Sequence, residues 1–205
     1  HCSYFEDRIE TSNVASLRQR NQFKSSCLKT LSRTHELTCN KRKIPFKAAY
    51  SSDSGRTIQT MDIILRETGL ETIPYKRDKR IREWCFGSLD GGYDGELFYG
   101  VLPRTDAFQG KDLHEVTYPE LAQGILDVDT AGWAEPWEVI KERIYSGFEA
   151  IAQRLEASGG GNAIVVSHGM TIGTFIWLLD EKRGKTPLDN GSITVVSYDN
   201  GRFTI

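Results

Sequence analysis

The sequence predicts an α/β protein in which helices cover both faces of a largely parallel β-sheet. Short apolar runs rich in β-branched residues alternate with longer amphipathic stretches along most of the 205-residue chain. Strands that alternate with helices usually pair in parallel, because each helix returns the chain to the same edge of the sheet. At the end of the chain, an Asp-Asn-Gly turn between the apolar runs 192–198 and 202–205 predicts an antiparallel hairpin instead.

The elements follow one another clearly from residue 44 onward. Polar residues 51–54 provide an N-cap for a helix that ends at Gly69. Glycines 159–161 are typical of a helix stop rather than a phosphate-binding loop, because they precede a strand. Residues 96–135 are expected to form an irregular insertion with short helical pieces. The predicted strands are 46–50, 72–75, 164–166, 192–198 and 202–205, and the predicted helices are 55–68, 137–157 and 171–179.

Composition and charge are ordinary for a globular protein, with 39% hydrophobic and 26% charged residues. The longest apolar stretch, around 175–179, is too short to cross a bilayer, and no secretory signal opens the chain. No cysteine pair has CxxC spacing and no histidine pair has HxxxH spacing, so we expect no metal site. These observations favour a cytoplasmic protein.

Residues 1–43 differ from the remainder of the chain. They hold nine Lys/Arg against four Asp/Glu, whereas residues 44–205 hold 17 against 24. They also contain Cys2, Cys27 and Cys39, and their apolar residues are sparse. We expect an atypical basic segment here, disordered or frame-shifted, with at most one weak helix around 15–31 and no strong first strand. A basic arm can contact nucleic acid, but this one lacks interleaved aromatic residues, so we expect no such partner.

The run 164–166 predicts a buried strand, which a Ser-His-Gly turn ends at His168, and a helix is predicted from Thr171 to Leu179. This order places an imidazole at the carboxyl edge of the sheet, next to the unpaired N–H groups of a helix N-terminus. Such a place can hold an anion, and phosphate is the commonest. The alternative is a structural histidine in a β–α turn.

Two more segments carry side chains suited to phosphoryl transfer. Arg56 lies in the first turn of the helix that follows strand 46–50, where its guanidinium and the helix N-terminus can face one anion. Glu83 lies in an apolar and aromatic stretch, where partial burial would raise its pKa and suit it to proton donation. A solvated arginine and a surface glutamate are the alternatives.

The three segments, in this order and spacing, resemble the motifs of the histidine phosphatase superfamily, the phosphoglycerate-mutase-like group. They are residues 50–60, with Ser-Ser-Asp-Ser-Gly-Arg-Thr, residues 82–91, with Arg-Glu-Trp-Cys-Phe-Gly, and residues 165–172, with Ser-His-Gly. Residues 188–194 resemble the family's last core strand. The resemblance covers residues 44–205, which we expect to form the phosphatase-like domain.

The resemblance implies a three-layer αβα sandwich with its active site at the carboxyl edge of a mostly parallel sheet. Members transfer a phosphoryl group to a histidine and then to water or a second hydroxyl. By motif position, Glu83 would be the proton donor and His168 the second histidine, which holds the phosphoryl oxygens. Arg56 would clamp the phosphate, with Ser52 and Gly169 as further phosphate-binding candidates. The resemblance implies no metal and no organic cofactor.

The chain departs from the family at the first motif. Members carry Arg-His-Gly at the end of the first strand, with the nucleophilic histidine, and no Arg-His-Gly occurs here. His1 and His35 are the nearest candidates. Three explanations stay open: a shifted reading frame or wrong gene model in residues 1–43, a chain that begins at or just past the nucleophile, and a natural member that has lost catalysis. We also expect the first strand to be missing or disrupted.

We therefore expect a phosphomonoester hydrolase of the phosphohistidine type, with activity weak or lost in the chain as written. The alternatives are a phosphoglycerate-type mutase and a non-catalytic module that binds a phosphate ester through Arg56 and His168. The expected partner is a small phosphorylated substrate, with neither nucleic acid nor membrane involved. Residues 92–135 are expected to form a lid or wall that selects among a sugar phosphate, a nucleotide and a phosphorylated acid.

Overall fold

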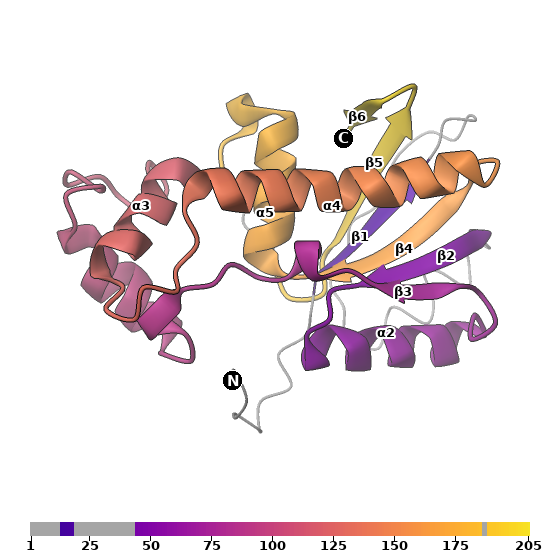
Figure 1. The fold of residues 1–205 in the computed structure, drawn as a ribbon, viewed down its shortest axis with the longest axis horizontal. Helices are drawn as coiled ribbons and strands as arrows, with labels where there is room; N and C mark the ends of the chain where they lie inside the picture. Colours follow the sequence, from indigo (N-terminus) through magenta and orange to yellow (C-terminus); the bar gives the residue numbers. More distant parts are fainter. Residues whose placement is uncertain (1–12, 19–43, 186–187) are drawn as a thin grey trace.

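The computed structural model describes residues 13–18, 44–185 and 188–205. In these residues six strands form one sheet in the order β3-β2-β4-β1-β5-β6, with helices on both faces (Figure 1). The strands are β1 (Asn13–Arg18), β2 (Phe46–Ser51), β3 (Tyr75–Arg77), β4 (Asn162–Ser167), β5 (Ile193–Asp199) and β6 (Arg202–Thr204). The helices are α2 (Gly55–Thr68), α3 (Tyr118–Val128), α4 (Trp137–Ala157) and α5 (Gly169–Leu179), with short turns of 3-10 or π-helix between them.

The sheet has a parallel half and a mixed half. Strands β3, β2 and β4 run parallel, so their carboxyl ends lie at one edge of the sheet. Strand β1 is antiparallel to β4 and parallel to β5, and β5 and β6 form the predicted antiparallel hairpin. The expected α/β fold is thus confirmed, with its parallel strands on the side that carries the phosphoryl-transfer motifs.

Strand β1 corrects the expectation that no first strand precedes residue 44. Residues 13–18 pair with β4 on one side and with β5 on the other, at the centre of the sheet. Local sequence did not predict this strand, because its apolar residues are few and its place depends on hydrogen bonds to two distant segments. The expected helix around 15–31 is wrong for 15–18, and the rest of that range lies outside the described residues. The proposed domain boundary at residue 43 stays a prediction.

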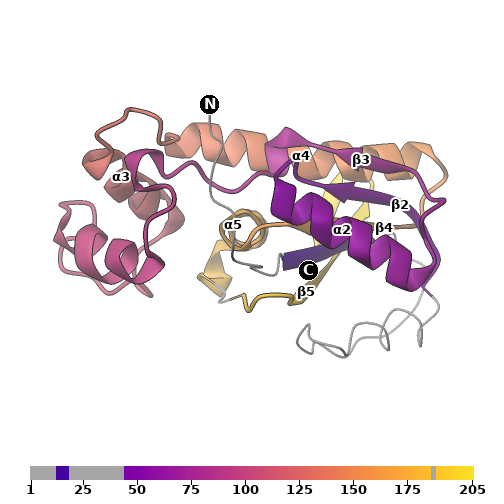
Figure 2. The ribbon, with the colours of Figure 1, turned by 90° about the horizontal axis from the view of Figure 1, so that it is seen from below.

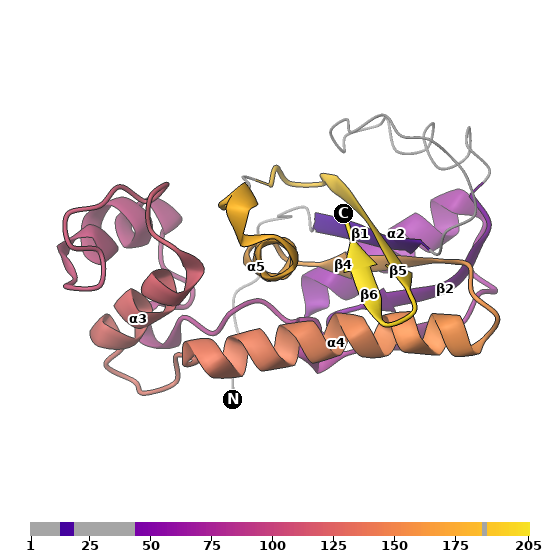
Figure 3. The same cartoon turned by 90° about the horizontal axis from the view of Figure 1, so that it is seen from above.

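The alternation of side chains along β4 builds the layers. Ala163 and Val165 belong to the core cluster formed with α4 and α5, whereas Ile164 and Val166 pack with residues of α2. A strand buried on both faces must be apolar at every position, which explains its unbroken β-branched run. Figures 2 and 3 show the resulting three layers, with α2 on one side of the sheet and α4 with α5 on the other.

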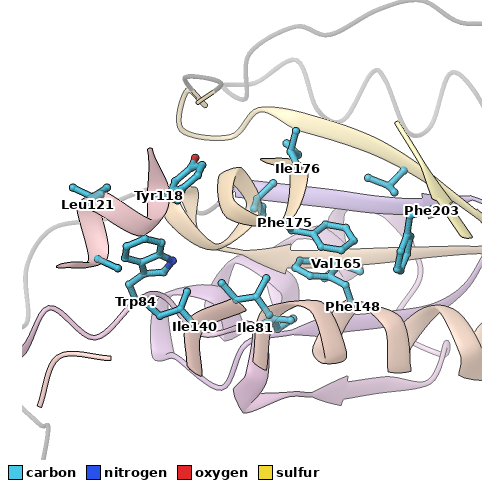
Figure 4. Close-up of a cluster of buried hydrophobic side chains, with 14 of the residues drawn as sticks. Ile81, Trp84, Tyr118, Leu121, Ile140, Phe148, Val165, Phe175, Ile176 and Phe203 are labelled. Atoms are coloured by element: carbon cyan, nitrogen blue, oxygen red, sulfur yellow. The ribbon is translucent and has the colours of Figure 1, made fainter. Parts of the chain in front are cut away.

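The larger core is joined by aromatic rings between α4, α5 and the final hairpin. Phe148 and Phe175 stack with their centroids 4.1 Å apart, and Phe203 meets Phe175 edge-on at 5.0 Å. Figure 4 shows these rings beside Val165 of the sheet. Phe148 and Phe175 are both almost fully buried, so this contact holds α4 against α5 and both helices against β4.

Residues 87–135 form a lobe beside the sheet rather than over its face, at the left of Figure 1. The Asp129 carboxylate ties the two ends of the lobe together. It accepts the main-chain N–H of Ser88 at 2.7 Å, and those of Trp133 and Ala134 at 2.7 and 2.8 Å. These hydrogen bonds lower the pKa of Asp129. Gly87 lies directly against this carboxylate at a φ of +63°, where a side chain would clash.

Aromatic rings connect the lobe to α4 and α5. Tyr118 packs against Trp84 at 5.8 Å and against Trp177 at 5.9 Å, and Trp137 lies 5.6 Å from Trp177. The close approach of the Tyr118 hydroxyl requires a glycine at position 173, where a Cβ would lie 2.3 Å from that oxygen. The lobe is therefore packed firmly onto the first turns of α5.

The predicted elements from residue 44 onward agree closely with the structure. Helices 55–68 and 137–157 have the bounds predicted, and glycines 159–161 follow the end of α4 as a helix stop. The strand expected at 72–75 lies instead at Tyr75–Arg77, because its start is set by pairing with Ala49 of β2. Trp133 is 67% exposed, whereas Trp137 packs against the core and Phe148 is buried.

The Phe148–Phe175 contact generates a stability prediction. Phe148→Ala removes a buried ring from between α4 and α5, and we expect the free energy of unfolding to fall by about 3–5 kcal/mol. Urea denaturation measures this loss. The control is Val139→Ala on the same helix, which removes a half-exposed side chain. A loss below about 1 kcal/mol in Phe148→Ala would contradict this account of the core.

Candidate active site

The candidate site lies where β2 and β4 end. Ser51 is the last residue of β2 and pairs with Val166, one residue before the end of β4. The main-chain N–H of Ser52 donates to the carbonyl oxygen of Val166 at 3.1 Å. This pairing brings the residues that follow the two strands, Ser52 and His168, side by side although they are 116 positions apart in the sequence.

His168 is held in one tautomer by its neighbours. Its Nδ1 accepts hydrogen bonds from Arg56 Nε at 3.1 Å and from Arg56 Nη2 at 2.9 Å. A guanidinium can only donate, so Nδ1 carries no proton and Nε2 does. The Nε2–H group therefore donates to the hydroxyl of Ser52, with the two atoms 2.7 Å apart.

The hydroxyl of Ser52 in turn donates a hydrogen bond to the hydroxyl of Thr57. The Thr57 hydroxyl donates to the carbonyl oxygen of Ser54 at 2.9 Å, so it must accept from Ser52, whose Oγ is 2.6 Å away. Ser52 thus accepts from His168 and donates to Thr57. Because the proton lies on the histidine side of the Ser52–His168 contact, His168 cannot act as a base toward Ser52, which excludes a serine nucleophile activated by this imidazole.

Burial and positive charge keep His168 neutral. The side chain is 3% exposed, and its pKa falls to about 3, first because of burial and then because of the charges of Arg56 and Arg143. Asp53 opposes this shift weakly. A neutral imidazole can orient the Arg56 guanidinium without repelling it, which leaves the arginine's charge available at the exposed side of the site.

The Glu83 carboxylate occupies the N-terminus of α5. One oxygen accepts the main-chain N–H of Thr171 at 3.1 Å, and the other accepts that of Met170 at 3.3 Å. His168, the N-cap residue itself, makes no side-chain cap, so Glu83 caps this helix from a distant segment. Burial raises the pKa of Glu83, although the main-chain N–H groups of Trp84 and Met170 and the charge of Arg56 oppose the shift.

An ion pair joins the two loops at the rim of the site. The guanidinium of Arg82 contacts both carboxylate oxygens of Asp53, with Nη2 and Oδ2 2.6 Å apart. The Arg82 hydrogen bond lowers the pKa of Asp53. Arg82 is more than half exposed, so the pair adds little stability, but it links the loop before α2 to the segment that carries Glu83.

The structure brings together the candidate site residues that lie in its described part. Ser52, Arg56 and His168 are in direct contact, Gly169 begins α5 beside them, and Glu83 reaches the same helix start. His1 and His35, the candidates for the nucleophile, lie outside the described residues. His114 is exposed in the lobe.

Sequence reasoning missed several residues that support the site. Thr57 stands within a quoted motif, and its polar side chain at a buried helix position could have indicated a role. Arg143 and Glu135 gave no local signal, because a charged residue on an amphipathic helix or in a loop usually faces solvent. In the part of the chain that the structure describes, no group of three or more His, Cys, Asp or Glu side chains could hold a metal ion. Among those same residues, no helix has the length and apolar composition needed to cross a membrane.

Comparisons with known proteins agree with this geometry. The sequence model of the histidine phosphatase superfamily (branch 1) matches residues 32–205. The structure is similar to that of phosphoglycerate mutase from Bacillus anthracis str. Sterne, with 27% sequence identity, a TM-score of 0.75, and coverage of 97% of this chain and 94% of that one. Bacillus stearothermophilus YhfR has the same fold, with 22% identity, a TM-score of 0.60 and coverage of 95% of each chain.

The neutral state of His168 predicts a pH dependence of stability. The unfolded chain protonates this imidazole below about pH 6.5, whereas the folded chain does so only near pH 3. Stability from this group is therefore complete above pH 6.5 and is lost as the pH falls from 6.5 toward 3, at up to about 1.4 kcal/mol per pH unit.

Denaturation by urea at pH 7 and pH 5 measures this slope. His168→Asn removes the titrating group, and we expect a shallower loss of stability between the two pH values than in wild type. The exposed His114→Asn should keep the wild-type slope. An unchanged slope in His168→Asn would mean that the imidazole is not held neutral.

The directed chain of hydrogen bonds predicts a role for Ser52. Ser52→Ala leaves the buried Nε2–H group of His168 without its acceptor, so we expect unfolding free energy to fall by about 1–3 kcal/mol. The matched control is Ser54→Ala in the same loop, because the Ser54 side chain makes no capping hydrogen bond. Equal losses in the two variants would refute the proposed hydrogen-bond chain.

Proposed function

This chain belongs to the histidine phosphatase superfamily, and on that premise we propose that it binds a phosphomonoester at the carboxyl edge of its sheet and hydrolyses it. The observation that carries the proposal is the convergence of Arg56, His168 and Glu83 on the start of α5. Charge on a phosphoryl group spreads over its oxygens, so the site needs fixed cations and N–H donors. Arg56 and the first turn of α5 are such donors.

In this proposal each residue has a distinct task. Arg56 binds the phosphate oxygens, and neutral His168 fixes the guanidinium through Nδ1. Ser52, which is fully buried, acts through His168 rather than on the phosphate directly. Gly169 lets the substrate approach the helix start, because it has no side chain.

Glu83 is the proposed general acid. When the bond between phosphorus and the ester oxygen breaks, the electron pair stays on that oxygen, and the Glu83 carboxyl supplies its proton. A raised pKa supports this role, because more of the carboxyl is protonated near neutral pH. The nucleophile is assigned to a histidine of residues 1–43, His1 or His35. By this resemblance the phosphoryl group passes to an imidazole and then to water.

A non-catalytic phosphate-ester-binding module is the second candidate. The observation in its favour is that His168 is the histidine found at the site among the described residues, and its free lone pair already accepts from Arg56. An imidazole in that arrangement binds and orients but does not attack phosphorus. Such a module would bind phosphate esters without turnover.

The test combines binding of inorganic phosphate, followed by calorimetry, with hydrolysis of 4-nitrophenyl phosphate and of phenyl phosphate. We expect Arg56→Ala to weaken phosphate binding about 10- to 100-fold, because a charge-assisted hydrogen-bond donor is lost. We expect Glu83→Gln to bind phosphate normally and to lower kcat about 100-fold for the poorer leaving group, phenol. The control, Arg66→Ala, removes an exposed arginine from the same helix as Arg56.

The outcomes separate the two candidates. Turnover that is lost in His168→Ala and Arg56→Ala supports the hydrolase, and a nucleophile must then lie within this chain. Saturable phosphate binding without turnover supports the binding module. If wild type neither binds phosphate nor hydrolyses either ester, both proposals fail.

A further inference from the structure

Arg143, in the second turn of α4, contacts the main chain of the segment that carries Glu83. Its Nη1 donates to the carbonyl oxygens of Arg80 and Arg82, each at 2.9 Å, and its Nη2 donates to that of Glu83 at 3.0 Å. The side chain is only 15% exposed. One planar guanidinium thus fixes the direction of three carbonyl groups in this segment, including that of Glu83 itself.

Glu135 holds the Arg143 guanidinium in place. The two side chains form a bidentate pair, with Arg143 Nε and Nη2 each 2.6 Å from a carboxylate oxygen of Glu135. The same carboxylate accepts the main-chain N–H of Cys85 at 3.1 Å. The pair therefore contacts the chain on both sides of Glu83.

The opposite side of this segment is fastened to β4 and α5. The hydroxyl of Ser167 donates to the carbonyl oxygen of Ile81 at 2.8 Å, and that of Thr171 donates to the carbonyl oxygen of Arg82 at 2.5 Å. The segment 80–85 is consequently held between α4 on one side and the start of α5 on the other. These contacts hold the backbone at Glu83 so that its carboxylate meets the N–H groups of Met170 and Thr171.

We propose that Arg143, oriented by Glu135, is a positioning residue that sets the Glu83 carboxyl at the start of α5 for proton donation. The inference rests on the proposed function of Glu83. Arg143 itself contacts main-chain carbonyl groups and Glu135, so it acts through Glu83 and not on the substrate. A lysine cannot replace it, because an ammonium group lacks the planar fork that reaches carbonyl and carboxylate groups together.

Hydrogen exchange tests the positioning role without requiring turnover. In Arg143→Gln and Arg143→Lys we expect faster exchange of the Met170 and Thr171 amides, whose N–H groups donate hydrogen bonds to Glu83 in the wild type. We expect the amides of Trp84 and Cys85 to exchange faster as well. The matched control is Arg154→Gln, which removes another arginine from α4. The Arg154 guanidinium lies 4.0 Å from the Asp78 carboxylate. If Arg143→Gln fails to fold, Glu135→Gln provides the same readout with a smaller change of shape.

Kinetics give a second readout that a purely structural role would not move. We expect Arg143→Lys to lower kcat up to about 100-fold for phenyl phosphate, which needs a proton donor, while kcat for 4-nitrophenyl phosphate and KM change little. The loss should not add to that of Glu83→Gln in the double variant.

Two outcomes would overturn the proposal. One is exchange that rises in residues 80–86 while the Met170 and Thr171 amides stay protected as in wild type. The other is an equal loss of kcat for both esters. Failure of the proposed function is seen separately, as absence of phosphate binding and turnover in the wild-type protein, and leaves the exchange result interpretable.

Discussion

The parallel pairing of β2 with β4 is the constraint on which the candidate site depends. Main-chain hydrogen bonds place Ser51 opposite Val166, and this pairing fixes which residues lie next to each other after the two strands end. Ser52 meets His168 for this reason, and the helices that follow, α2 and α5, begin at the same edge of the sheet. Arg56 in the first turn of α2 and the N–H groups of α5 therefore face one small volume.

Burial and charge then determine what the side chains at that edge can do. His168 stays neutral because it is buried beside Arg56, and its tautomer is fixed because a guanidinium can donate hydrogen bonds but cannot accept them. Glu83 is partly buried, but it lies at the positive end of α5, which offsets part of the cost of its charge. The pKa values of the two groups therefore shift in opposite directions: the pKa of His168 falls and that of Glu83 rises. Such a divergence is typical of sites that transfer protons.

The site is supported from outside the sheet as much as from within it. The lobe of residues 87–135 is closed by Asp129 and packed onto α5 through Tyr118. Helix α4 spans both parts, since it contacts α3 of the lobe and its middle reaches the core through Phe148. A long helix that bridges the two regions couples the position of the lobe to the segment that carries Glu83.

The sequence by itself determined the class of fold, the helices α2 and α4 to the residue, and the residues brought to the carboxyl edge. Those features follow from local patterns: apolar periodicity, capping residues, and polar residues at the ends of buried strands. Only the tertiary structure decided the central place of β1, because its strand forms by pairing with two distant partners rather than by its own apolar content.

The tertiary structure alone also decided the tautomer of His168, the capping of α5 by Glu83, and the contact of Arg143 with the Glu83 segment. Each joins residues 60 or more positions apart in the sequence. A hydrogen bond depends on distance and direction in space, and spacing along the chain carries no record of either when the partners lie on different elements.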